Sequence, residues 1–74
     1  MMKYEVSVID KGCKFYKLND KDGKRLATIE FSDWKFYKYN VSFAYNAVEN
    51  NLDKSRNFRT LAEAKKYVSE VINA

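Results

Sequence analysis

The stretch Trp34-Lys-Phe-Tyr-Lys-Tyr-Asn-Val-Ser-Phe-Ala-Tyr45 decides how a sheet can be built from this chain. Six of its twelve residues are aromatic. Successive side chains of an extended strand point to opposite faces. One face would carry Lys35, Tyr37, Tyr39, Val41, Phe43 and Tyr45, and the other Trp34, Phe36, Lys38, Asn40, Ser42 and Ala44. Because a small domain has one core, we expect some of this aromatic surface to stay in reach of a partner.

Three strands are predicted before this segment from the alternation of apolar and polar residues. They cover Lys3–Ile9, Cys13–Leu18 and Arg25–Phe31. The dipeptide Asp22-Gly23 predicts a two-residue hairpin turn between the second and the third strand. That turn would place Leu18 opposite Ala27, and Tyr16 opposite Ile29, on one apolar face. Phe15, Lys17, Thr28 and Glu30 would then lie on the other face.

The connection after Phe31 decides which face of the aromatic segment is buried. A two-residue turn at Ser32-Asp33 would put Phe31 opposite Trp34 and would continue the buried face with Lys38, Asn40 and Ser42. A three-residue loop, Ser32–Trp34, reverses the parity. Phe31 would then face Lys35, Ile29 would face Tyr37 and Ala27 would face Tyr39, with Val41 and Phe43 also buried. A β-bulge near Lys38–Asn40 is an alternative way to switch faces. We favour the odd-length loop, which leaves Trp34, Phe36 and Lys38 on the open face near Phe15 and Lys17.

The C-terminal part of the chain predicts a helix. Residues 44–52 are open to two interpretations, because Asn46–Asn50 could extend the strand or Ala44–Leu52 could form a short helix. Asn50–Ser55 is predicted to be a loop and Arg56–Phe58 a short last strand. Thr60-Leu-Ala-Glu63 has the pattern of a capping box, and the apolar residues that follow repeat at helical spacing. These apolar residues are Leu61, Ala64, Val68 and Val71.

These elements predict one compact α+β domain over residues 1–74. It would be an antiparallel sheet of four to five strands with one C-terminal amphipathic helix packed on one face. The chain has 46% hydrophobic residues and a net charge of +4, as expected of a mildly basic folded domain. No stretch of 18 apolar residues and no signal peptide are visible, so we expect a cytoplasmic protein without a membrane segment.

The residue types present argue against catalysis. There is no histidine and only one cysteine, Cys13. These absences remove the commonest general base, the commonest metal ligand and every Ser/His or Cys/His nucleophile pair. Cys13 alone cannot complete a zinc site, which needs about four ligands. We therefore expect no enzyme activity, no metal, no cofactor and no small-molecule substrate.

Surface recognition remains as the expected function. Aromatic rings combined with basic side chains suit a protein interface, where aromatic residues are enriched at hot spots. They also suit single-stranded nucleic acid, whose bases stack on rings while its phosphates attract lysine. The expected partner-binding residues are Phe15, Lys17, Trp34, Phe36, Lys38, Arg56 and Arg59.

The Lys-Asp-Gly-Lys hairpin at residues 21–24, the aromatic strand and the ending from Phe58 to Val68 together resemble small phage and mobile-element accessory proteins. Some proteins of this kind are anti-CRISPR or anti-defence proteins. The arm-binding domains of integrases, a three-stranded sheet with a helix, are similar too. The resemblance implies a non-enzymatic inhibitor or adaptor that blocks a protein or nucleoprotein complex. The alternatives are a small basic DNA- or RNA-binding module and a homodimer formed through an exposed edge strand.

Overall fold

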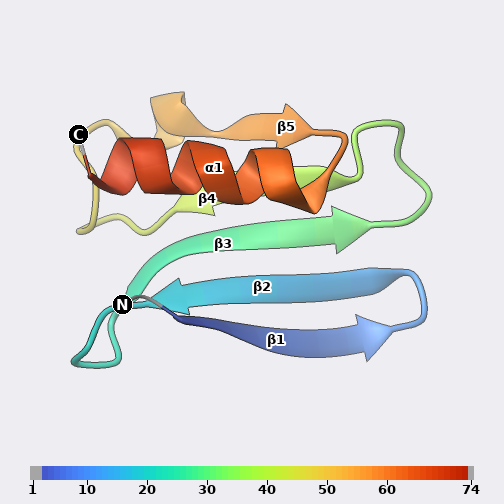
Figure 1. The fold of residues 1–74 in the computed structure, drawn as a ribbon, viewed down its shortest axis with the longest axis horizontal. Helices are drawn as coiled ribbons and strands as arrows, with labels where there is room; N and C mark the ends of the chain where they lie inside the picture. The colour runs from blue at the N-terminus through green and yellow to red at the C-terminus, as the bar shows by residue number, and fades with distance from the viewer. Residues whose placement is uncertain (1–2, 74) are drawn as a thin grey trace.

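The computed structural model describes residues 3–73 and has two layers, a five-stranded antiparallel sheet and one helix (Figure 1). The strands lie in the sheet in the order of the chain, β1-β2-β3-β4-β5. A short 3-10 helix, η1, connects β4 to β5. The bounds are β1 Lys3–Asp10, β2 Cys13–Asn19, β3 Arg25–Ser32, β4 Tyr39–Phe43, η1 Asn51–Lys54, β5 Arg56–Phe58 and α1 Leu61–Ile72. The predicted fold class is confirmed.

The hairpin between β2 and β3 has the predicted register but a different turn. Leu18 pairs with Ala27 and Tyr16 with Ile29, as the apolar pattern requires. Three residues, 21–23, form the turn instead of two, because Asp20 N donates to Lys24 O at 2.8 Å. The register shifts between Leu18 and Asn19, and this shift absorbs the extra residue. Gly23 supplies the left-handed backbone of the turn with φ 85°.

The connection from β3 to β4 has the predicted odd parity, but the predicted length was wrong. Ser32 N donates to Lys38 O at 2.8 Å, so five residues, 33–37, form the loop. We call this segment the aromatic loop. The predicted partners of β3, which were Lys35, Tyr37 and Tyr39, are therefore each shifted by four residues. The observed pairs are Phe31 with Tyr39, Ile29 with Val41 and Ala27 with Phe43.

The segment after β4 is neither a longer strand nor a short α-helix. Residues 45–50 form turns, and Asn50 has a left-handed backbone with φ 56° immediately before η1. The expected loop at Asn50–Ser55 thus contains a 3-10 helix. β5 covers Arg56–Phe58 as predicted and pairs with β4.

Helix α1 begins at the predicted cap. Glu63 N donates to the Thr60 hydroxyl oxygen at 3.2 Å. The same hydroxyl donates to Glu63 Oε1 at 3.0 Å, so the carboxylate binds the hydroxyl where the capping box expects a backbone N–H. Ala64 and Val68 are buried on the face that meets the sheet. This pattern agrees with the predicted helical spacing.

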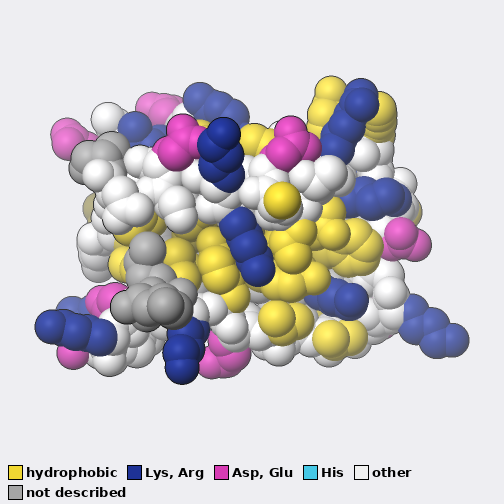
Figure 2. Space-filling view, viewed as in Figure 1, with side chains coloured by type: hydrophobic (Ala, Val, Ile, Leu, Met, Phe, Trp, Pro, Cys, Tyr) yellow, Lys and Arg dark blue, Asp and Glu magenta, His cyan; other side chains and the backbone are white. Residues whose placement is uncertain are grey.

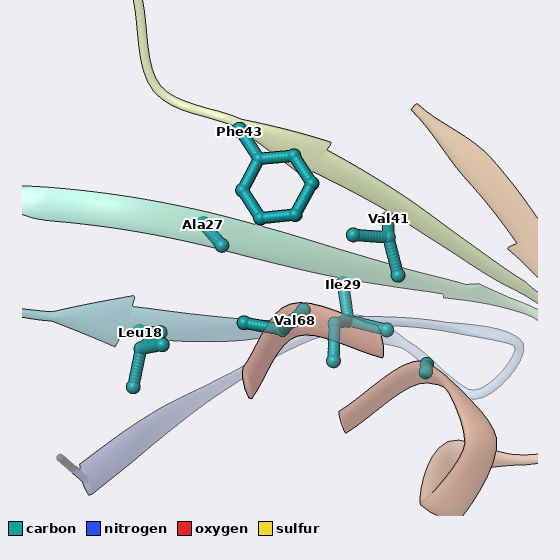
Figure 3. Close-up of a cluster of buried hydrophobic side chains, with 7 residues drawn as sticks. Leu18, Ala27, Ile29, Val41, Phe43 and Val68 are labelled. Atoms are coloured by element: carbon teal, nitrogen blue, oxygen red, sulfur yellow. The ribbon is translucent and has the colours of Figure 1, made fainter. Parts of the chain in front are cut away.

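The core lies between α1 and one half of the sheet. Figure 3 shows its buried side chains pointing into the space between the helix and the strands. They are Leu18, Ala27, Ile29, Val41, Phe43, Ala64 and Val68. Within residues 3–73, the backbone of α1 lies against β3, β4 and β5 (Figure 1), whereas the helix-side face of β1 and β2 is covered only in part, since Leu18 is buried but Val6 and Val8 are exposed. The opposite, open face carries the residues that alternate with the core.

In the described part of the chain, no helix combines the length and the apolar character that crossing a membrane requires.

Candidate partner-binding surface

The aromatic loop is fixed at one end of the sheet by the turn between β1 and β2. Asp33 N donates to Gly12 O at 2.9 Å. The Trp34 ring lies over the same glycine, since a Cβ atom built on Gly12 would be 3.5 Å from the ring. Two turns that are distant in sequence therefore support each other. The loop is held in place although it contains no regular secondary structure.

Three aromatic side chains of this loop face solvent. The exposed fractions are 69% for Trp34, 61% for Phe36 and 50% for Tyr37. Burial of a large aromatic side chain removes about 150–250 Å² of surface from water. A partner that covered these exposed rings would therefore gain free energy from their burial. Trp34 and Phe36 were predicted to be open. Tyr37 was predicted to be buried on a strand, and that prediction was wrong because the strand begins only at Tyr39.

Arg59 joins the loop to the start of the helix. Its guanidinium carbon lies 4.3 Å from the centre of the Phe36 ring and 5.6 Å from the centre of the Tyr37 ring. The two rings meet edge to face, with their centres 4.9 Å apart. Phe36, Tyr37 and Arg59 thus form one continuous surface. Of the predicted site residues, Phe36 and Arg59 are the pair that the fold brings into direct contact.

Lys38 and Arg56, two other predicted partner-binding residues, form hydrogen bonds within the loops next to them. Lys38 Nζ donates to Asp33 O at 2.5 Å and lies 3.5 Å from Asp33 Oδ1. Arg56 Nη1 donates to the carbonyl oxygens of Asp53 and Ser55 at 2.8 and 2.7 Å. These contacts give both residues a role in loop structure.

Phe15 and Lys17 lie elsewhere, in the body of the sheet. Both are half-buried residues of β2, paired with Glu30 and Thr28 of β3. Phe15 and Lys17 were predicted to form one patch with Trp34, Phe36 and Lys38 on the open face of the sheet. That prediction was wrong, because Trp34 and Phe36 lie in the aromatic loop and not on a strand beside β2. Towards β4 and β5 the open face is polar, and Asn40 Nδ2 donates there to Asn57 Oδ1 at 2.8 Å.

Cys13 is in a setting that keeps its thiol protonated. Partial burial raises the pKa of the Cys13 thiol, and the nearby carboxylates of Glu30 and Asp10 raise it further. Lys35 lowers this pKa by a smaller amount. Reactive cysteines generally have a lowered pKa. Among residues 3–73, no three His, Cys, Asp or Glu side chains are grouped so that they could hold a metal ion.

Sequence reasoning missed two parts of the surface. Tyr37 was missed because the alternating residues 34–39 fit a strand as well as a loop. The partly uncovered helix-side face of β1 and β2 was missed because alternation indicates an apolar face but does not tell whether a helix reaches it. The apolar side chains of that face gather in the band between α1 and β1 in Figure 2.

Comparison with known protein families, with curated proteins and with solved structures returns no match for this chain.

Proposed function

We propose that this protein is a non-enzymatic binding protein of the phage inhibitor or adaptor kind, which blocks a protein or nucleoprotein complex through its aromatic loop. The observation that carries this proposal is the surface made by Trp34, Phe36, Tyr37 and Arg59. Three exposed rings lie on a loop that is anchored to the β1–β2 turn through Gly12, and Arg59, just before the helix, stacks on Phe36 of that loop.

The residue types of this surface support a protein partner. Trp, Tyr and Arg are the residues most enriched among binding hot spots, and they act best when neighbouring contacts exclude water. The anchoring supports the proposal too. The loop is tied to Gly12, and Arg59 is stacked on Phe36, so less conformational entropy is lost when a partner binds.

The experiment is affinity capture from host lysate, with and without nuclease, analysed by quantitative mass spectrometry. The double variant Trp34→Ala/Phe36→Ala should lose the partner retained by the wild type, and the loss should be the same in both nuclease arms. Tyr45→Ala is the matched control, because this exposed aromatic residue, at 83% exposure, lies outside the loop. Equal recovery of every captured protein by the wild type and the double variant would reject the aromatic loop as the binding surface.

A second candidate function is binding of single-stranded nucleic acid. The observation that favours it is the presence of two basic side chains beside the exposed rings, since Arg59 stacks on Phe36 and Lys35 follows Trp34 in the sequence. Bases stack on such rings, and binding of phosphates is strongly salt-dependent. Titration with a generic oligonucleotide would support this candidate if the affinity fell steeply between about 50 and 200 mM salt. Absence of oligonucleotide binding at about 50 mM salt would exclude this candidate function.

A further inference from the structure

A second surface, independent of the aromatic loop, lies on the helix-side face of β1 and β2. Its side chains share the parity of the core but extend past the edge of α1. They are Tyr4, Val6 and Val8 of β1, Tyr16 of β2 and Phe31 of β3. Val6 is 52% exposed and Val8 is 63% exposed. We call these five residues the apolar strip, and it belongs to the band between α1 and β1 in Figure 2.

The width of the sheet leaves room for one more helix on this face. Neighbouring strands lie about 4.8 Å apart, so the outer two of five strands are roughly 19 Å apart. Packed helices are separated by about 8–10 Å, so a sheet of this width accepts two of them. In the described structure the backbone of α1 lies against β3, β4 and β5, and α1 reaches β1 and β2 through side-chain contacts, such as Lys65 on Tyr4 and the core contact with Leu18. The apolar strip occupies the position of the second helix.

Two lysine side chains lie on rings of the apolar strip and add positive charge to it. Lys65 Nζ, from α1, is 4.9 Å from the centre of the Tyr4 ring. Lys14 Nζ, from β2, is 5.9 Å from the centre of the Phe31 ring. Within residues 3–73, neither ammonium group has a carboxylate within 4.0 Å, since the ion pair found there joins Lys38 to Asp33. The strip is therefore apolar along its length and positive at two points.

The two positive points are separated along the strand direction. Lys65 lies over Tyr4, and Lys14 pairs with Val8. Tyr4 and Val8 are four residues apart in an extended strand, which corresponds to about 13 Å. Along a helix, residues about seven positions apart lie on the same side and are about 10.5 Å apart, a separation that the long lysine side chains can bridge.

We propose that the apolar strip binds an amphipathic helix of a partner protein, with an apolar face and two carboxylates about seven residues apart on one flank of that face. Its apolar side chains would cover Val6 and Val8 and complete the helical layer on the sheet. Its carboxylates would pair with Lys14 and Lys65. Such a helix needs about 18 residues to follow the eight residues of β1.

A second copy of this chain fits the strip poorly. Face-to-face pairing of two strips would bring Lys14 and Lys65 of both copies into one interface without an added carboxylate. The outward side of α1 cannot serve as the missing helix either, because it carries exposed polar residues. These are Glu63, Lys66, Ser69 and Glu70.

The test is a nuclear magnetic resonance titration of the full chain with two designed helical peptides of about 18 residues. Both have Leu at positions i, i+3, i+4 and i+7, and they differ in carrying either Glu or Lys at the two flanking positions. We expect the Glu peptide to bind about tenfold more tightly, from two ion pairs. Amide shifts should centre on Val6, Val8 and Phe31.

Two double variants that replace lysine by glutamate, one at the strip and one away from it, serve as test and control. Lys14→Glu/Lys65→Glu should reverse the preference, so that the Lys peptide binds more tightly. Lys24→Glu/Lys66→Glu makes the same change in net charge at exposed positions away from the strip, and it should keep the wild-type preference. The wild-type comparison of the two peptides tests the proposal even where a variant is unstable.

Four results would overturn the proposal. They are equal affinity for both peptides, absence of binding at about 1 mM peptide, shifts centred on the aromatic loop, and concentration-dependent dimerisation through the strip without peptide. The Trp34→Ala/Phe36→Ala variant should bind the Glu peptide like the wild type. Failure at the strip and failure at the aromatic loop are thus distinguishable.

Discussion

Single residues determine what the surface of this protein can do chemically. Cys13 is half-buried in β2, and its surroundings raise the pKa of its thiol. The charge that would lower this pKa comes from Lys35, whose effect is smaller than those of burial and of the two carboxylates. The thiolate, which is the nucleophilic form, is therefore less populated near neutral pH than in a free cysteine.

We predict that Cys13 reacts slowly with iodoacetamide. At pH 7 its rate should be several-fold below that of an unstructured cysteine peptide, and the pH midpoint of the reaction should lie above about 8.5. Mass spectrometry of the modified protein over time measures the rate. Addition of denaturant should restore the peptide rate. A rate for the folded protein equal to that of the peptide would contradict the assigned environment of Cys13.

At the scale of the elements, short turns connect the strands and set how neighbouring strands pair. Asp20 closes the β2–β3 turn, where its Oδ1 accepts hydrogen bonds from Asp22 N at 2.8 Å and from Lys24 N at 2.9 Å. This side chain satisfies two backbone donors that the turn leaves unpaired. Gly23 provides the left-handed backbone that lets the chain reverse direction between the two strands.

We predict that Asp20→Ala lowers the free energy of unfolding by about 1–2 kcal/mol, because both hydrogen bonds are lost. Asp20→Asn keeps an acceptor oxygen and should cost less than half as much. Urea unfolding followed by circular dichroism measures both values. Equal losses for the two variants would show that the negative charge, and not the acceptor geometry, stabilises the turn.

Most elements could be predicted because local patterns specify them. The apolar alternation in β1 to β3, the pairing of Leu18 with Ala27 and the cap at Thr60 all depend on nearby residues. The length of the aromatic loop could not be predicted in the same way. Trp34 to Lys38 alternate as a strand would, and the loop is set by contacts with distant residues, such as the bond from Asp33 to Gly12.

The candidate site was predicted only in part for the same reason. Trp34 and Phe36 are exposed as predicted, but the reason is their position in the aromatic loop and not the parity of a strand, which would have buried Tyr37. The contact of Phe36 with Arg59 depends on where the helix start meets the end of the sheet. Phe15 and Lys17 were grouped with Trp34 by strand parity, and this grouping fails once Trp34 is in a loop.

At the scale of the whole molecule, one helix covers one half of a five-stranded sheet, and Tyr4 of β1 and Tyr39 of β4 are both partly buried on the helix-side face. Burial raises the pKa of the Tyr4 hydroxyl, and burial together with Tyr16 raises that of Tyr39. The folded state therefore holds these protons more tightly than the unfolded chain does.

We predict that stability falls at alkaline pH. A raised pKa in the folded state stabilises the fold below the ordinary pKa, and this stabilisation is lost as pH rises through the folded value. The decline should begin near pH 8.5 for the thiol and near pH 10 for the tyrosines. Urea midpoints measured across this range test it. Tyr4→Phe/Tyr39→Phe should flatten the decline above about pH 10, and an unchanged slope would contradict the assignment.

The central claim is that the rings of the aromatic loop serve a contact outside the fold. The free energy of unfolding of Trp34→Ala tests it most directly, with Phe43→Ala as the buried aromatic control. We predict a loss below about 1 kcal/mol for Trp34→Ala, because its ring is mostly in solvent, and a loss of about 3–5 kcal/mol for Phe43→Ala. A loss of about 3–5 kcal/mol for Trp34→Ala would show that the ring belongs to the core and would contradict the claim.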